Sequence, residues 1–578
     1  MTNGPILAPI AVRLRSYIPE WWDVLAALLA IGFLILLADA SRGVSEPLSA
    51  LSAQPISLSP WHLPEYAART TLRMLVALGL SLLFTFTYAT LAAHSRRAEL
   101  LLIPLLDILQ SVPILGFISV TVVFFMSLAP GRVLGAEFAA IFAIFTSQAW
   151  NMAFSFYQSL RTVPTELTEA SRCFRLTPWM RFWRVEVPFA MPQLIWNMMM
   201  SMSGSWFFVV ASEAISVGNK TVMLPGVGSY IALAIADRNL TAIGWAIGVM
   251  LIVILIYDQL LFRPLVAWAD RFRFEQEAGI TAPQSWVLTI LRRSRLIAWL
   301  TAPLGAIVNV SYRLFPMRER APAGRQIIAG GGWGDWVWYC VLLLAGGGIA
   351  WRARNFVASG VALPELLRVI VLGFWTLLRV FVLIALASAI WVPVGIWLGL
   401  RPKLTRIAQP IAQFLAAFPA NLLFPIAVSG IVAFSLNPDI WLSPLMILGT
   451  QWYILFNVIA GASALPSELR DIGANLQVRG WLWWRKVALP SVFPYYVTGA
   501  ITASGGSWNA AIVAELAKWG DTQVQAHGLG AYIARATAAG DFHRVVLGII
   551  VMSGFVTIVN RVFWRPLYYY AERKFRLG

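Results

Sequence analysis

The chain has 578 residues, of which 59% are hydrophobic and only 12% are charged, and its formal net charge is +17. A soluble domain carries roughly twice that charged fraction, so the composition excludes a water-soluble protein and indicates one that crosses a membrane several times. The positive charge does not indicate nucleic-acid binding, because the Lys and Arg residues stand in short loops between apolar runs and leave no continuous basic face for phosphates.

The first apolar run, residues 21–38, follows Arg13 and Arg15. About 20 apolar residues cross a bilayer as a helix, so this run predicts a first transmembrane helix. The small residues after it would also fit a cleaved signal. We favour a retained helix, because the second half has a similar run at 333–349. The predicted N-terminal region 1–64 is therefore one transmembrane helix and a periplasmic segment.

Further apolar runs follow in chain order. They cover residues 67–93, 99–128, 133–160, 187–215 and 241–262, then 333–350, 368–398, 405–434, 437–462, 489–516 and 543–564. Only helices or closed barrels span lipid, since the backbone finds no water there, and these runs are much longer than barrel strands of about ten residues. The chain is therefore predicted to be an all-α polytopic membrane protein, with two tandem six-helix units and about 12 transmembrane helices.

The two halves repeat one pattern at a spacing of 302 residues. The repeated elements are Pro164-x-Glu166-Leu167 and Pro466-x-Glu468-Leu469, Gly204-Ser205-Trp206 and Gly506-Ser507-Trp508, Gly226-x-Gly228-x-Tyr230 and Gly528-x-Gly530-x-Tyr532, and Arg263-Pro264-Leu265 and Arg565-Pro566-Leu567. A repeat this long indicates a duplicated fold unit. We place the first domain at 65–275, a cytoplasmic or interfacial linker at 276–332, and the second half at 333–578, with its core at 370–575.

The basic residues also predict the orientation. They concentrate in alternate loops, including 161–186, 263–330 and 463–488, and in the C-terminal tail. The positive-inside rule places these loops and both termini in the cytoplasm. An even number of spans in each half makes the repeat parallel rather than inverted.

The loops 161–186 and 463–488 combine acidic, aromatic and basic residues more densely than the other loops. Each begins with Pro and then Ser or Thr before acidic residues, which is typical of a helix N-terminus, where the helix dipole favours acids. Aromatic and basic residues follow. A short amphipathic helix outside the membrane, once in each half, is typical of a segment that docks into a groove on a partner.

These loops resemble the coupling motif of a known family, the MetI-like permeases of type I ATP-binding-cassette (ABC) importers, in the nitrate/sulfonate/taurine/bicarbonate group and its duplicated anion-permease branch. The motif reads Glu-Ala-Ala-x-x-x-Gly, followed by Val-x-x-Pro. The resemblance implies that the coupling residues are Glu166, Glu169, Ala170, Ser171, Arg172, Glu468, Asp471, Ile472 and Gly473. The chain departs from the motif at its glycine, which is replaced by Arg175 and Gln477, and this departure would alter the turn between two short helices.

The resemblance implies a transport subunit that is not itself an enzyme. Both permease halves would be fused in one chain of the bacterial inner membrane and would import a small anion by alternating access. The partners would be two ATP-binding subunits on the cytoplasmic side, a periplasmic or lipid-anchored solute-binding protein, and anionic lipids. The chain has no P-loop sequence, so we expect no directly bound cofactor, with ATP and Mg held by the partner subunits. Four scattered histidines predict no metal site.

Several repeated or unmatched polar residues are candidates for the gate or the substrate path. They are Arg73, Arg379, Asp107, Asn197, Ser205, Ser507, Glu213 and Glu515. Glu213 and Glu515 are expected near the periplasmic face, because about 25 helical residues after Pro188 and Pro490 cover roughly 37 Å. Both remain open between a gating role and a structural salt bridge. Arg73 and Arg379 could attract an anion or extend to lipid headgroups.

Two other functions stay open at this point. An importer of amino acids or glycine betaine would have the same architecture and differ only in its pocket. An ion-coupled secondary transporter could also have parallel repeats, but it would need acidic or basic residues at the membrane midplane, whereas the repeated acids here stand at the margins or in loops.

Overall fold

A computed structural model describes residues 21–25, 27–28, 31–32, 46–47, 55–272, 285–294, 303 and 333–575, with residues 113, 218–219, 464, 466 and 521 left out of these ranges. Most of the predicted first transmembrane helix and of the linker 276–332 therefore lies outside the described residues, and both stay predictions. The chain divides into two compact units that cut across the sequence repeat. One comprises 1–42, 158–196 and 255–329, and the other 43–157, 197–254 and 330–578.

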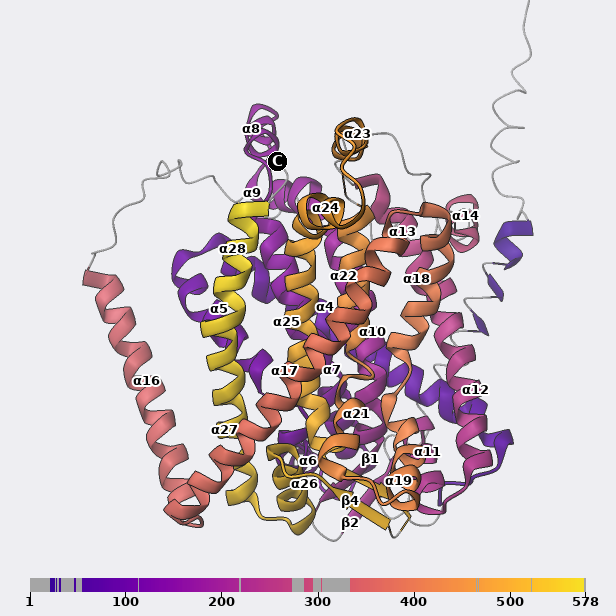
Figure 1. The fold of residues 1–578 in the computed structure, drawn as a ribbon, viewed down its shortest axis with the longest axis vertical. Coiled ribbons are helices and arrows are strands. Elements are labelled where there is room, and N and C mark those ends of the chain that lie inside the picture. Colours follow the sequence, from indigo (N-terminus) through magenta and orange to yellow (C-terminus); the bar gives the residue numbers. More distant parts are fainter. Residues whose placement is uncertain are drawn as a thin grey trace, which may run out of the picture. The chain divides into compact units, whose positions relative to one another are not determined.

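The first half is built from helices and one strand pair (Figure 1). Its elements are α4 (Leu63–His94), α5 (Arg96–Ser111), α6 (Ile114–Leu128), α7 (Val133–Arg161), α8 (Thr165–Cys173), α9 (Pro178–Arg181), α10 (Val187–Glu213), β1 (Ala214–Val217), β2 (Lys220–Met223), α11 (Val227–Ala236), α12 (Leu240–Tyr257), α13 (Arg263–Ala269) and α14 (Trp286–Arg293).

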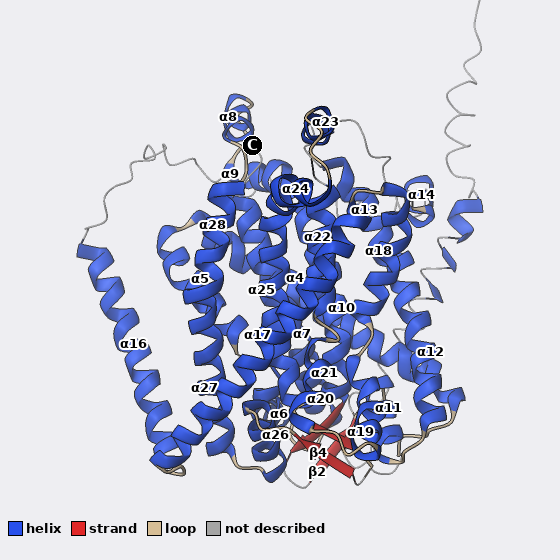
Figure 2. Cartoon of the chain, in the orientation of Figure 1, coloured by secondary structure: helices blue, strands red, loops and turns tan. Residues whose placement is uncertain are grey.

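The second half repeats this order. Its elements are α16 (Trp333–Ala358), α17 (Leu363–Gly399), α18 (Pro402–Ala417), α19 (Phe424–Ala433), α20 (Pro438–Trp441), α21 (Ser443–Ile447), α22 (Gln451–Ser463), α23 (Ser467–Asn475), α24 (Gly480–Trp483), α25 (Leu489–Ala514), β3 (Leu516–Trp519), β4 (Thr522–Gln525), α26 (Leu529–Ala539), α27 (Phe542–Val559) and α28 (Arg565–Phe575). Each strand pair is an antiparallel hairpin (Figure 2). The prediction of a tandem all-α polytopic membrane protein is confirmed.

Fewer helices than the predicted twelve are long and apolar enough to cross a membrane. In the described residues there are six, and a seventh if the bent pair Pro438–Ile447 and Gln451–Ser463 is one span. For two of the predicted spans the difference has a local cause. The apolar run 99–128 is broken after Val112 and the run 405–434 after Phe418, and both residues are extended and precede proline. Proline disfavours helical backbone at the residue before it, so each run forms shorter helices.

The duplication extends to irregular turns of the backbone. π-Helical turns occur at Phe182–Glu186 and Asp258–Phe262, and again 302 residues later at Trp484–Ala488 and Asn560–Trp564. Each ends two residues before a proline of the repeat. Proline cannot donate a backbone hydrogen bond to the residue four positions earlier and its ring crowds that carbonyl. A wider turn relieves the conflict, because the residue before the proline bonds to the carbonyl five positions back.

The core of the second half lies among α17, α22 and α25, which pack closely on one another. A Cβ added at Gly395 or Gly399 of α17 would overlap side-chain or backbone atoms of α22. Small residues allow helices in a membrane to approach this closely. A helix of the first half joins this packing, since α6 contacts α25, α26 and α27, and the Ile114 N–H donates to Asn509 Oδ1 at 2.7 Å.

Candidate functional site

An arginine of the first half is buried between two carboxylates. Arg73 on α4 is 4% exposed, and its Nε and Nη2 donate to the two oxygens of Glu137 on α7, each at 2.6 Å. Its Nη1 donates to Glu213 Oε1 at 2.7 Å, where α10 ends, and to the carbonyl of Pro225 at 2.9 Å. Both carboxylates are buried as well, so these charges are stabilised mainly by one another.

The start of α11 stabilises the second of these carboxylates. Glu213 Oε2 accepts the Gly228 N–H at 2.6 Å, and the Thr70 hydroxyl donates to Glu213 Oε1 at 2.7 Å. The same hydroxyl oxygen accepts the Val227 N–H at 3.0 Å. Helix N-termini favour negative charge, so Glu213 connects the end of α10 to α4 and to the start of α11.

The repeated Gly-x-Gly pattern follows from this contact. A Cβ on Gly226 would overlap the Glu213 carboxylate, and one on Gly228 would overlap the Val209 carbonyl of α10. Only glycine leaves room for the helix start to approach the carboxylate this closely. The repeated Gly-x-Gly pattern therefore marks the docking of α11 onto Glu213.

The second half repeats the network. Arg379 on α17 donates to Glu515 Oε1 at 3.0 Å and to Asp439 Oδ1 at 2.8 Å. Thr376 donates to Glu515 Oε1 at 2.8 Å, and Glu515 Oε2 accepts the Gly530 N–H at 2.8 Å. Asp439 stands 302 residues after Glu137, so all the charged members of the network are duplicated.

The two networks differ in their contact with water. Glu137 is buried, whereas the Asp439 side chain is 36% exposed and also accepts the His527 N–H at 2.6 Å. His527 itself is exposed and stands where the first half has Pro225. The second network is therefore the more open of the two.

Arg73 and Arg379 do not extend to lipid headgroups, because only 4% and 11% of their side-chain surfaces are exposed. Their positive charge is engaged by carboxylates, so it is not presented to a passing anion. Glu213 and Glu515 form the salt bridges that one alternative expected. A gating role for them is untested.

Sequence reasoning missed the threonines and the second carboxylates of these networks. The signal was present, because Thr70 and Thr376 are 306 residues apart, as are Arg73 and Arg379, and Glu137 and Asp439 keep the 302-residue spacing. Thr70 and Thr376 stand three residues before their arginines, on the same helix face.

The remaining path candidates make contacts between helices. Ser205 Oγ lies 2.9 Å from Ser147 Oγ, and Ser507 Oγ lies 3.0 Å from Thr450 Oγ1. Asn197 donates to Ser155 Oγ at 2.8 Å. The backbone of Asp107 belongs to α5, and its side chain lies outside the described part. A role of these residues in lining a path stays a prediction.

We predict that Arg73→Gln will lower the free energy of unfolding by about 3–5 kcal/mol, since it leaves two buried carboxylates without a cation. Thermal unfolding of the purified protein in detergent measures the change. Arg69→Gln is the matched control on the same helix. Its i,i+4 pair with the exposed Glu65 contributes less than about 1 kcal/mol. Equal stability of the two variants would contradict the assigned role of the buried network.

In the first predicted coupling loop, α8 presents its acidic residues outward. Glu166, Glu169, Ala170 and Arg172 are exposed. Ser171 is buried, and its hydroxyl donates to the Thr168 carbonyl at 2.6 Å. The helix therefore has an exposed charged surface and one residue that faces inward.

In the second loop, α23 has the same length and position in the repeat. Asp471 and Ile472 are exposed and Gly473 is buried, while the side chain of Glu468 lies outside the described part. Exposed apolar residues follow at Leu476 and Trp481. This end of the second half thus presents both apolar and acidic groups to its surroundings.

The missing motif glycines do not alter the turn. Arg175 and Gln477 have φ of 53° and 54°, in the left-handed region that glycine favours. After α8, the Leu176 N–H donates to the Ser171 carbonyl at 3.0 Å, and after α23 the Val478 N–H donates to the Gly473 carbonyl at 2.9 Å. Each helix therefore ends with a left-handed residue at the position where glycine usually stands. The replacement of the motif glycine by Arg175 and Gln477 does not change this turn.

The left-handed conformation of Gln477 predicts a graded response to substitution. A β-branched side chain is strongly disfavoured at positive φ, so Gln477→Val is expected to lower stability by about 1–2 kcal/mol. Gln477→Asn will be tolerated, because asparagine adopts this conformation more readily. Thermal unfolding of the two variants measures the difference. An equal effect of Val and Asn would contradict the observed turn.

In the described residues, no group of three or more His, Cys, Asp or Glu side chains could hold a metal ion. The charged clusters are instead closed networks of arginine and carboxylate. This arrangement can join helix ends, and the exposed helices α8 and α23 can bind a partner.

Comparison with known proteins identifies the family. A family described as the inner membrane component of binding-protein-dependent transport systems matches the chain twice, over residues 85–263 and 391–575. These two segments together exceed half of the chain, and they coincide with the two repeated cores.

Individual relatives match only one part of the chain. The bicarbonate transport system permease protein CmpB of Synechococcus elongatus is 30% identical over 192 residues, 32% of this chain and 66% of the relative. The nitrate import permease protein NrtB of Leptolyngbya laminosa is 28% identical over 181 residues, 31% of this chain and 61% of the relative. The glycine betaine/carnitine transport permease protein GbuB of Listeria monocytogenes is 28% identical over 170 residues, which are 29% of this chain and 54% of the relative. The chain thus spans just under two thirds of the length of the first relatives.

Proposed function

Since this chain belongs to the family of inner membrane components of binding-protein-dependent transport systems, we propose that it is the complete membrane pathway of an ABC importer for a small oxyanion. The observation that supports this most is the double family match, with one coupling-type helix in each half. A single chain then supplies both halves that alternating access needs.

The relatives support the proposed substrate class. The two named first are permeases for bicarbonate and nitrate, which are small oxyanions of similar size. The match to a glycine betaine/carnitine permease keeps a second candidate, a small zwitterion, within the same class. An ion-coupled secondary transporter is not favoured, because the chain is a family member and its buried repeated acids are all in pairs with arginine.

We assign the cytoplasmic partners to the two exposed helices. Two ATP-binding subunits, which hold ATP and Mg, would contact α8 and α23 through the residues from Glu166 to Arg172 and from Glu468 to Gly473. A solute-binding protein would deliver the anion at the opposite face. The chain would lie in the inner membrane with both termini in the cytoplasm. The exposed acids of α8 and α23 would couple the chain to the ATPase subunits.

Replacing these acids tests the assignment. We expect Glu166→Gln with Glu169→Gln, and separately Glu468→Gln with Asp471→Asn, to weaken association with the ATPase subunits about tenfold or more, because charge-assisted hydrogen bonds contribute about 1.5–3 kcal/mol. ATPase activity of the reconstituted complex measures the loss. Glu65→Gln, an exposed acid on α4 outside both loops, is the control. Unchanged ATPase stimulation in both loop variants would overturn the assignment.

Uptake into proteoliposomes tests the substrate class. The whole complex is expected to accumulate labelled bicarbonate or nitrate in the presence of ATP. Accumulation of labelled glycine betaine instead would favour the second candidate. Uptake driven by an ion gradient without ATP would contradict an ABC importer.

A further inference from the structure

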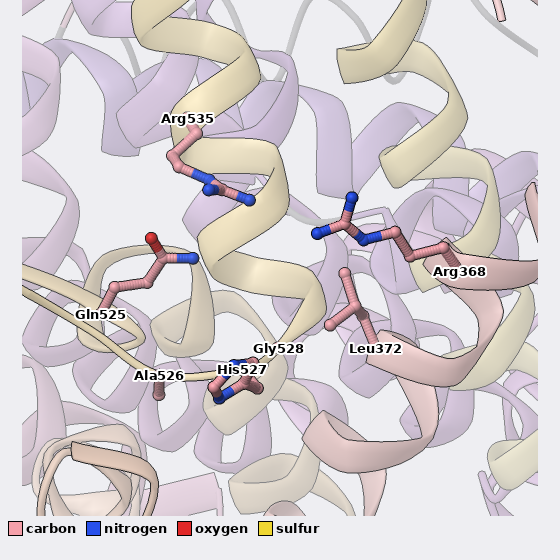
Figure 3. Close-up of a pocket in the computed structure, with 7 residues that line it drawn as sticks. All are labelled: Arg368, Leu372, Gln525, Ala526, His527, Gly528 and Arg535. Carbon is pink, nitrogen blue, oxygen red and sulfur yellow. The ribbon is translucent and has the colours of Figure 1, made fainter. Parts of the chain in front are cut away.

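A cavity of about 300 Å³ opens in the second half next to α26. Its lining residues come from α17, from β4 and the residues after it, and from α26 (Figure 3). They are Arg368, Leu372, Gln525, Ala526, His527, Gly528 and Arg535. Within this half, α26 and β4, which contribute to the lining, lie at the end opposite α23 (Figure 1). If α23 contacts an ATPase in the cytoplasm, the cavity faces the side from which substrate arrives.

Two guanidinium groups point into the same space. Arg368 extends from α17 and Arg535 from α26, and the Gln525 amide points toward them from a third side (Figure 3). Among the residues that the structure describes, neither arginine forms a hydrogen bond or an ion pair with another side chain. Two facing positive charges without a counter-charge repel each other, so this arrangement favours an added anion.

The acids nearest in the sequence are already engaged. Glu365, one helical turn before Arg368, accepts from Arg544 Nε at 2.8 Å and from the Tyr532 hydroxyl at 2.9 Å. Burial, together with this bond to a carboxylate, raises the pKa of Tyr532 above its usual range. The hydroxyl therefore remains a donor, and Glu365 stays turned toward these partners.

Three further acids near the lining are engaged as well. Asp439 accepts from Arg379 and from His527. Glu515, beside Gly528, accepts from Arg379 and from the Gly530 N–H, and Asp541 accepts from Arg544. The lining of the cavity itself includes no carboxylate. Its charged groups are therefore both positive, with a histidine and an amide beside them.

The first half lacks both arginines of this cavity lining. At the repeat spacing, Arg535 corresponds to Leu233, Gln525 to Met223 and His527 to Pro225. At the 306-residue spacing of the α4 and α17 arginines, Arg368 corresponds to His62. The fold of a half therefore does not require these two arginines, since the first half forms the same elements without them.

We propose that this cavity binds a small planar oxyanion between Arg368 and Arg535, as the first binding site that the anion meets on the permease. A guanidinium offers parallel N–H donors whose spacing fits two oxygens of a planar trigonal anion. Two such groups and an amide donate to such an anion from three sides. Facing positive charges also raise the local anion concentration and the rate of association. The role of the site in transport rests on the proposed function, whereas anion binding itself does not.

Titration of nitrate, and separately of bicarbonate, into the purified full chain in phosphatidylcholine nanodiscs tests the site. Isothermal calorimetry at constant ionic strength measures the affinity. Arg368→Gln and Arg535→Gln are each expected to weaken binding about tenfold or more, because each removes a charge-assisted contact. Arg354→Gln on α16, an exposed arginine outside the cavity, removes the same charge and should leave the affinity unchanged. Equal affinity in all four proteins overturns the proposal.

A second arm separates a free anion from a lipid headgroup. Nitrate affinity is expected to persist when phosphatidylglycerol replaces half of the nanodisc lipid. If the anionic lipid abolishes nitrate binding in the parent chain, the headgroup is the occupant and the proposal fails.

Uptake by the whole complex separates this inference from the proposed function. Arginine-dependent nitrate binding, with ATP-driven uptake of glycine betaine only, would overturn the oxyanion importer and leave the site standing. ATP-driven nitrate or bicarbonate uptake that both arginine variants leave unchanged at limiting substrate would overturn the site alone.

Discussion

A buried arginine held between two carboxylates is the constraint on which the rest of each half depends. Charges removed from water are stable only when each is paired and hydrogen-bonded. Arg73 and Arg379 each meet this condition with two carboxylates, which come from two other helices. The positions of the helix ends, the glycines at the start of α11 and α26, and the threonines that complete the hydrogen bonding all follow from satisfying those charges.

The two halves share this buried network but differ in how far it is exposed to water. Both halves keep the network, the left-handed turn after the exposed helix, and the π-helical turns before proline. They differ where the network meets water, since Asp439 is partly exposed beside His527 while Glu137 is buried. The two unpaired arginines of the cavity lie next to this more open network. An importer with one substrate needs one path, so asymmetry at this end is compatible with a pseudo-symmetric scaffold.

Much of the fold and of the family could be predicted from the sequence. Apolar runs located the helices, because lipid leaves the backbone no other partner than itself. The 302-residue repeat indicated the duplication, and the family model matches the chain twice, at 85–263 and 391–575. The count of twelve spans was less secure, because hydropathy registers Val112 and Phe418 as apolar residues and overlooks the prolines that follow them. The rule for residues before proline could have divided those runs.

The sequence by itself determined membrane location, helical class, duplication and family, since these depend on local composition and on spacing along the chain. Only the tertiary structure decided what the charged residues do. Arg73 and Glu213 are 140 positions apart, and Arg368 and Arg535 are 167 apart. Nothing in their local patterns distinguishes an arginine that is neutralised by buried acids from one that faces an open cavity. That difference is set by which helices pack together, because the charge state and the partners of a side chain depend on its surroundings in space.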